Sequence, residues 1–436
     1  MLLKSKNFNK LHRLHRWLGL ILSVHILLLA LTGIVLVFRD ELAPTQTPVP
    51  LTGQPVSLQS LVDKSLAQYP QDRVLAIGLD HHNPHKASLR LGPDGSPKFR
   101  GARRLHFDRR NGELYKDSQQ DTGLIQTLLI LHRELFLGTP GKLYVGILGL
   151  IYAVILITGL VLYGPLMKRQ SFGSLRTHLN PRHWWADLHK NFGALTFGWS
   201  LVVGLSGFML GWGGPIIKFY QGYALQDLTA EFSGPQENRS FVPVDQALQA
   251  AEKAKPNGQF SFVAFPTSEF STAHHYIFVM DGTTPLTEKL SDLVVVNAYD
   301  GQLERVLIQP WYLQLLLLAE PLHFGDYGGL PMKILWVIFG LASMVLPVSG
   351  LRIFLQKFWK QQEQKRSLAF HPSKGSPSQH PYAWPLVVMG LSWMGLVYAL
   401  LVEGPRDAWA NLCLGAALII PVWLFRKHKR TVASDS

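Results

Sequence analysis

Six long apolar runs constrain the fold of this chain more than any other feature of its sequence. A helix needs about 20 apolar residues to cross the hydrocarbon core of a bilayer, and runs of this kind recur along the 436 residues. Only 16% of the residues are charged, whereas soluble domains carry about 25%. The sequence therefore predicts an α-helical polytopic membrane protein with six spans, at 17–38, 143–163, 192–212, 333–354, 384–402 and 408–425.

The basic residues predict the orientation of these spans. Lysines and arginines gather before the first span, between the second and third, after the fourth and after the sixth. The net charge of +13 thus follows the positive-inside rule, and we expect no nucleic-acid partner. Both termini are expected in the cytoplasm. The first run lacks a small-residue cleavage site, so we expect it to remain as an anchor.

The long segments between spans predict extramembrane domains. Each contains an amphipathic helical pattern, then strand-like stretches and an Asn-Gly or Asp-Gly turn, which is typical of a small α+β domain. The predicted organisation is a cytoplasmic N-terminus with the first span (1–38), an outer domain with an interfacial helix (39–142), the second span (143–163), a cytoplasmic loop (164–191), the third span (192–212), a second outer domain with an interfacial helix (213–332), the fourth span (333–354), a second cytoplasmic loop (355–383), the last two spans (384–425) and a cytoplasmic tail (426–436).

One pattern occurs twice in the chain, which predicts a duplicated helix–domain–helix unit followed by two further helices. All four repeated spans end in Thr-Gly or Ser-Gly. Small residues allow membrane helices to pack closely, and they also leave room for a flat cofactor; the sequence leaves both readings open. The matched positions are His15 and Gly33 with His189 and Gly207, 174 residues apart in both cases, and His132 with His323, 191 residues apart.

Four of the seventeen histidines recur in both copies of the repeat. A histidine near a membrane boundary is often only an interfacial polar residue. Symmetry, however, would pair His15 with His189 toward the cytoplasm, and His132 with His323 toward the outside. Two imidazoles without a nearby carboxylate or thiolate make a poor zinc site, but they suit the two axial positions of a haem iron. The lone Cys413 excludes an intrachain disulfide and a cysteine cluster. We therefore expect two bis-histidine haem b groups.

His25 is a fifth candidate cofactor-binding residue. It lies ten residues after His15, hence about 15 Å deeper along the helix, and an ionisable group at that depth is a functional candidate. Three readings stay open: an alternative haem ligand, a hydrogen-bond partner of a haem propionate, and a hydrogen-bonded packing residue.

Several motifs resemble the PepSY-associated transmembrane family over roughly residues 10–355. They are the span entry His15-Arg16-Trp17-Leu18-Gly19 with its exit Leu31-Thr32-Gly33, the strand ends at 105–108 and 296–301, and Leu322-His323 with Gly328-Gly329. Members include bacterial inner-membrane ferrisiderophore reductases that bind two haems through histidines of the membrane helices. The resemblance implies the same roles for His15, His132, His189 and His323, and PepSY-like periplasmic domains at about 55–117 and 243–305.

The resemblance also implies a function. The expected protein is a haem-dependent reductase of the inner membrane that passes electrons to a periplasmic ferric siderophore or other ferric chelate and releases Fe(II). Some relatives carry a flavin and nicotinamide module that has no counterpart here, which implies a separate electron donor, either a quinol or a reductase. We assign no catalytic residue beyond the haem ligands. Two alternatives remain open: a non-enzymatic protein whose outer domains bind a partner, and an iron or siderophore permease.

Overall fold

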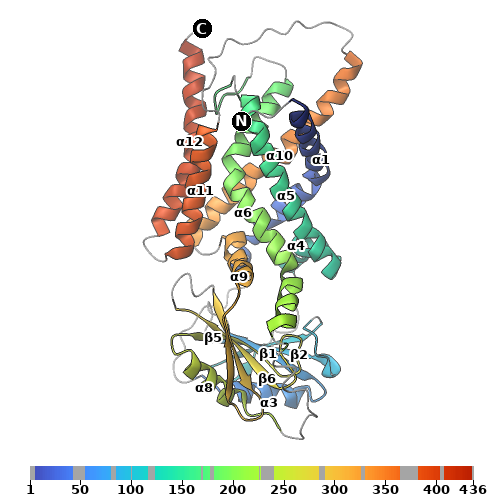
Figure 1. Cartoon of the computed structure of the whole chain (residues 1–436), viewed down its shortest axis with the longest axis vertical. Coiled ribbons are helices and arrows are strands. Elements are labelled where there is room, and N and C mark those ends of the chain that lie inside the picture. Colours follow the sequence, from blue (N-terminus) through green and yellow to red (C-terminus); the bar gives the residue numbers. More distant parts are fainter. Residues whose placement is uncertain are drawn as a thin grey trace. The chain divides into compact units, whose positions relative to one another are not determined.

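The computed structural model describes residues 5–42, 55–79, 85–99, 101–115, 123–167, 170–176, 181–224, 226, 240–283, 290–325, 329–363, 382–402 and 407–434. They fall into two compact units. The first comprises residues 1–43, 127–212 and 319–436, and the second comprises residues 44–126 and 213–318. Helices make up the first unit, and the second contains the sheet (Figure 1).

Among the described residues, four helices are long and apolar enough to cross a membrane: α1 (Ser5–Leu36), α5 (Gly138–Met167), α6 (Pro181–Ala224) and α10 (Gly329–Glu363). The chain is therefore a multi-pass membrane protein. The helices α11 (Ala383–Leu401) and α12 (Asp407–Ser434) contain shorter apolar stretches, so the fifth and sixth spans remain a prediction. Helices α5, α6 and α10 extend beyond their predicted spans at both ends, whereas α1 begins before its predicted span and ends at Leu36, two residues short of the predicted end.

Glycines and aromatic side chains bring the long helices together. At the α5–α6 contact, a Cβ on Gly149 would lie 2.6 Å from the carbonyl oxygen of Gly204, so these two backbones touch directly, as small residues permit in membranes. Trp199 of α6 and Trp336 of α10 pack in a buried cluster that also includes side chains of α11 and α12. The last two helices lie side by side (Figure 1) and pack against α6 and α10.

Three short helices accompany the long ones: α2 (Arg39–Leu42), α4 (Leu124–Glu134) and α9 (Trp311–Phe324). The last two directly precede α5 and α10. Leu135 and Phe136, with φ of 49° and 60°, separate α4 from α5, and Gly325, with φ of 67°, ends α9. The indole N–H of Trp336 donates to the carbonyl oxygen of His323 at 3.1 Å, which fixes the end of α9 against α10.

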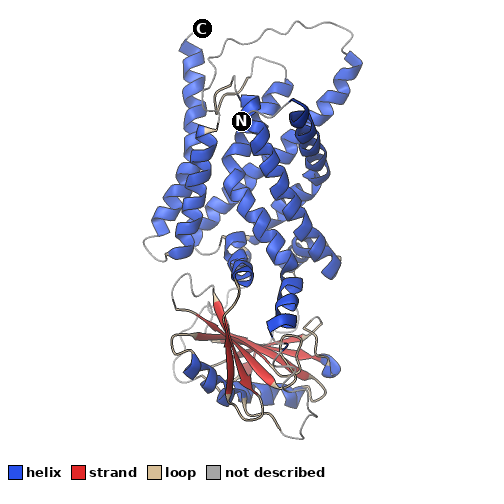
Figure 2. Ribbon diagram, viewed as in Figure 1, coloured by secondary structure: helices blue, strands red, loops and turns tan. Residues whose placement is uncertain are grey.

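The second unit is one antiparallel sheet with two helices on one face (Figure 2). In the part of this unit that the structure describes, eight strands have the order β4-β3-β2-β1-β5-β6-β7-β8. The elements of the first half are α3 (Leu58–Gln68), β1 (Arg73–Leu79), β2 (Lys86–Gly92), the 3-10 turn Pro93–Gly95, β3 (Arg103–Asp108) and β4 (Glu113–Leu114). Those of the second half are α8 (Val244–Ala254), β5 (Gln259–Ala264), β6 (His275–Asp281), β7 (Ser291–Asn297) and β8 (Leu303–Leu307).

The two predicted outer domains share one sheet and one hydrophobic core. Strands β1 and β5 pair antiparallel, with Ile77 opposite Val263, and side chains of α3 and α8 enter the same buried cluster. The helices also cap each other, because the Asp245 carboxylate accepts bonds of 2.9 and 2.8 Å from the first backbone N–H groups of α3. The pairing of β1 with β5 removes one exposed sheet edge from each half. Residue patterns within each segment do not reveal this contact, because it joins distant segments. Strands β4 and β8, beyond the predicted turns, were also missed.

Candidate functional site: two facing pairs of histidines

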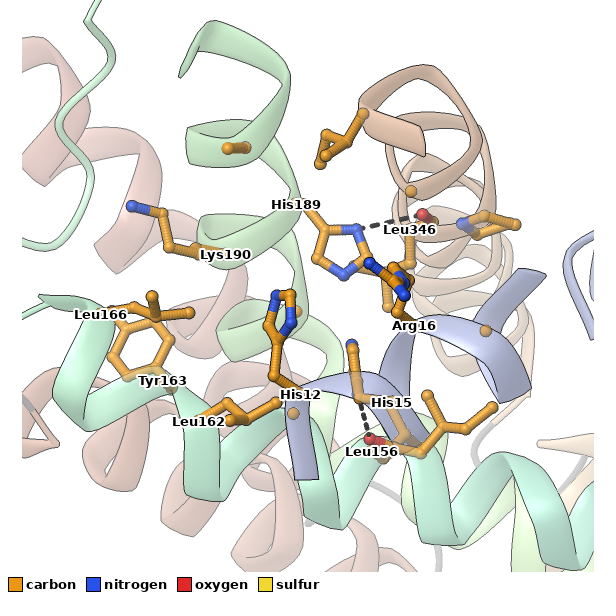
Figure 3. Close-up of a pocket in the computed structure, with 18 of the residues that line it drawn as sticks. His12, His15, Arg16, Leu156, Leu162, Tyr163, Leu166, His189, Lys190 and Leu346 are labelled. Carbon is orange, nitrogen blue, oxygen red and sulfur yellow. Dashed lines mark hydrogen bonds between the residues drawn. The ribbon is translucent and has the colours of Figure 1, made fainter. Parts of the chain in front are cut away.

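The first site is formed by His15 of α1 and His189 of α6. Their ring centres are 6.1 Å apart and their planes are nearly perpendicular, at 84°. The two side chains approach each other from separate helices (Figure 3). The structure thus brings together one of the histidine pairs that the repeat had suggested.

Hydrogen bonds fix which nitrogen of His15 carries the proton. Its Nδ1 lies 3.2 Å from the carbonyl oxygen of Ile155 and 3.0 Å from Oγ1 of Thr158. A carbonyl oxygen can only accept, and the Thr158 hydroxyl donates its own proton to the Ile155 carbonyl at 2.8 Å, so Nδ1–H must be the donor. The lone pair of Nε2 is therefore left available, as metal coordination requires.

His189 repeats this arrangement on another helix. Its Nδ1 lies 2.9 Å from Oγ of Ser349 and 3.1 Å from the carbonyl oxygen of Leu346. The Ser349 hydroxyl donates to that same carbonyl at 3.1 Å. By the same reasoning, Nδ1 of His189 carries the proton and Nε2 is the free nitrogen.

The second site pairs His132 of α4 with His323 of α9. Their ring centres are 6.2 Å apart at an interplanar angle of 62°. Nδ1 of His132 bonds to Oγ1 of Thr32 at 2.9 Å. Nδ1 of His323 bonds to Oγ of Ser206 at 3.2 Å and donates to the carbonyl oxygen of Val203 at 3.0 Å. The structure places His132 on α4 and His323 on α9, in the segments before the second and fourth spans where the sequence predicted interfacial helices.

The glycine after each hydroxyl residue makes room for an imidazole. A Cβ on Gly33, Gly159 or Gly207 would lie 3.1 Å from Cε1 of His132, His15 and His323 respectively. At Gly350 the distance to Cε1 of His189 would be 3.6 Å. Each of the four Thr-Gly and Ser-Gly pairs therefore forms a contact site for one histidine: the hydroxyl group accepts a hydrogen bond from Nδ1, and the glycine leaves space for the imidazole ring. The sequence showed these pairs but not their partners.

The two sites lie near opposite ends of α1. His15 belongs to the first site, while Thr32, 17 residues later on the same helix, holds the second. At 1.5 Å per residue this separation is about 26 Å, close to the thickness of the hydrocarbon core of a bilayer, which is about 30 Å.

The spacing of each pair fits an iron held between two imidazoles. With metal–nitrogen bonds of about 2 Å and about 1 Å from each nitrogen to its ring centre, two trans imidazoles have centres about 6 Å apart. Each pair offers two histidine nitrogens, whereas a zinc site normally takes four protein ligands, or three and a water. The donor set therefore fits a haem, whose porphyrin supplies the other four ligands.

A cavity of about 610 Å³ surrounds His15 and His189, within the size range of small-molecule and cofactor pockets. Gly19 and Gly193, one helical turn beyond the two histidines, both line it. A Cβ on Gly19 would meet nothing within 4 Å, so the cavity is open at this point. This shape fits a flat macrocycle between α1 and α6. Arg16, His12 and His183 also line the cavity, although sequence patterns did not assign these three residues to the site.

His25 lies apart from both pairs in its contacts. Its Nδ1 donates to the carbonyl oxygen of Ile21 at 3.2 Å, and its Nε2 accepts from the Tyr144 hydroxyl at 3.0 Å. Both nitrogens are thus bonded within the protein, and His25 does not line the cavity. Of the three open readings, this geometry favours a hydrogen-bonded packing residue.

Comparison with known proteins agrees with the architecture. No curated protein matches the chain in sequence. The family described as the PepSY-associated TM region matches residues 12–357. This segment contains all four paired histidines and the four Thr-Gly and Ser-Gly pairs that contact them. The chain therefore belongs to the PepSY-associated TM family.

Proposed function

We propose that this protein is a di-haem reductase of the bacterial inner membrane that passes electrons across the membrane to a periplasmic ferric siderophore or other ferric chelate and releases Fe(II). The observation that carries the proposal is the pair of facing imidazole sites, each with both Nδ1 atoms held by hydroxyl groups. Helix packing alone would not require four histidines that each bond through Nδ1 and leave Nε2 available, in pairs whose ring centres are 6.1 and 6.2 Å apart.

The residues of this chain would hold and tune the cofactors. A haem b held by these histidines would supply one-electron transfer. The hydroxyls of Thr158 and Ser349 at one site, and of Thr32 and Ser206 at the other, orient the imidazoles and raise their basicity through the Nδ1–H bond. Apolar side chains such as Leu22, Leu156 and Phe197 line the cavity around His15 and His189 and would pack against the faces of the cofactor.

The proposed direction of electron flow follows from charge and topology. The segments with most lysine and arginine flank the ends of the helices nearest His15 and His189, which puts this pair on the cytoplasmic side by the positive-inside rule. His132 and His323 then face the periplasm, together with the sheet domain. This topology includes six spans, a duplicated unit and cytoplasmic termini. Electrons would enter from a quinol or a separate reductase.

The substrate class rests on the reductases that the family includes. A chelator that prefers Fe(III) releases its metal once the iron has gained one electron. A protein that held two reduced haems would store two electrons, so it should reduce two ferric chelates.

The test is a stoichiometric reoxidation. Anaerobic protein reduced with dithionite and freed of excess reductant should lose its reduced haem bands when a ferric siderophore is added. A coloured ferrous chelator should then report up to two Fe(II) per protein. The gallium(III) complex of the same siderophore is the matched control, because it has a shape similar to that of the ferric complex but gallium(III) does not accept an electron under these conditions. Colourless protein after expression with added haem, or reduced bands that persist with several ferric chelates, would contradict the proposal.

A further inference from the structure

The cavity around His15 and His189 has a strongly positive lining. Four of its lining residues are cationic: Arg16, Arg176, Arg182 and Lys190. None of its described lining residues is a carboxylate. The remainder of the wall is largely apolar, with Leu22, Leu156 and Phe197 among the side chains. A charged group in such surroundings is costly unless it is paired, so a lining cation without a partner would favour an anionic occupant.

One neighbouring carboxylate offsets part of this charge. Asp187, which is fully buried, accepts from Arg176 at 2.7 Å and from Lys190 at 3.0 Å. It provides one negative charge for two cations, and it also holds both side chains in place. These two ion pairs do not include Arg16.

Arg16 is the cation that is best placed for an occupant. It follows His15 in the chain and lines the same cavity (Figure 3). Its Nε atom is buried and has no hydrogen-bond partner among the described residues, although such donors are rarely left unpaired in proteins. Its guanidinium carbon lies 5.5 Å from the ring centre of Trp17, and this contact with the ring face does not occupy the Nε–H donor.

We propose that Arg16, with Lys190 as its counterpart on α6, binds the two propionates of the haem at the His15–His189 site. This inference rests on the proposed function. Lys190 follows His189 as Arg16 follows His15, so each ligand histidine is succeeded by a cation, and two cations meet two carboxylates. Arginine suits this role because it donates two parallel hydrogen bonds to a carboxylate. His25, whose two ring nitrogens are bonded elsewhere, is not the propionate partner.

The test compares haem with its dimethyl ester, which keeps the iron and the macrocycle but lacks the two negative charges. Purified apoprotein of the His132→Ala variant, and separately of His323→Ala, retains only the His15–His189 site under the proposed pairing. Each is titrated with either compound while the Soret band is recorded. Arg16→Gln is then compared with Arg13→Gln, which changes an exposed arginine on the same helix that does not line the cavity.

The expected result is a loss of affinity that depends on the carboxylates. Arg16→Gln should weaken haem binding at least about tenfold, since hydrogen bonds to charged groups are among the stronger ones, and should change binding of the dimethyl ester little. Arg13→Gln should affect neither. Equal weakening of both compounds, or equal affinity of the parent protein for both, would overturn the propionate assignment while leaving the haem site intact. Failure of the parent protein to bind either compound would instead refute the proposed function.

Discussion

Replacing Gly159 by alanine should disturb the His15 imidazole, whereas the same change at Gly350 should be tolerated. The added Cβ at Gly159 would lie 3.1 Å from Cε1 of His15, so that the ring would have to shift by a few tenths of an ångström. The ring is tied at Nδ1 to Thr158 and to the Ile155 carbonyl, in the same helical turn that receives the new methyl group. It cannot shift without lengthening those bonds.

Overpacking of this kind costs about 1–3 kcal/mol. If the ring relaxes in the apoprotein, that cost appears in cofactor binding, as a loss of affinity of about five- to a hundredfold at about 1.4 kcal/mol per factor of ten. At Gly350 the Cβ would lie 3.6 Å from Cε1 of His189, an ordinary van der Waals contact, and the expected change is below about threefold.

Haem titration of the two variants, each in the His132→Ala background, measures the difference directly. The thermal midpoint of the apoprotein serves as the control for folding. Equal affinities of Gly159→Ala and Gly350→Ala would refute the idea that these glycines position the imidazoles, as would a loss that is larger at Gly350.

Three further predictions concern single contacts. Thr158→Val removes one of the two acceptors of His15 Nδ1–H and should lower haem affinity at that site about tenfold, measured by Soret titration; no change would show that the carbonyl alone suffices. Asp245→Ala removes the side chain that accepts from two N–H groups of α3 and should cost about 1–2 kcal/mol, seen as a lower thermal midpoint of the full-length protein, while an unchanged midpoint would contradict the capping role. The hydrogen bond from Arg110 holds the pKa of Asp108 below its ordinary range. This pair therefore stabilises the sheet domain at pH values above the unfolded-state pKa of about 4, and its contribution disappears as the pH falls through the lower folded-state pKa. Asp108→Asn should destabilise the domain at neutral pH and less in acid, and an equal loss of stability at both pH values would argue against this linkage.

Local patterns were sufficient to predict most of the secondary structure. Apolar runs located α1, α5, α6 and α10, because a helix that faces lipid must be apolar over the thickness of the bilayer. Alternating apolar residues located most of the strands of the sheet domain. Residue patterns within each segment did not reveal that the two halves join through β1 and β5, since such pairing depends on contacts between distant segments.

The candidate site was only partly visible in the sequence. The internal repeat singled out His15, His189, His132 and His323, because equivalent residues of a duplicated unit would meet across a pseudo-twofold axis. The Thr-Gly and Ser-Gly ends were visible as a pattern, but their role depends on which imidazole each receives. The cationic lining around Arg16 was missed, because basic residues near a membrane boundary are already accounted for by topology.

The central claim is that two pairs of histidines hold two haems, and the most direct measurement is haem per protein in five alanine variants. By the pyridine haemochrome assay, the parent protein should contain two haems. His15→Ala and His189→Ala should each lose one haem, and the remaining haem should have the same midpoint potential in both. His132→Ala and His323→Ala should each lose the other, while His25→Ala should keep both. A full complement in any of the first four variants, or a loss in His25→Ala as large as theirs, would contradict the account.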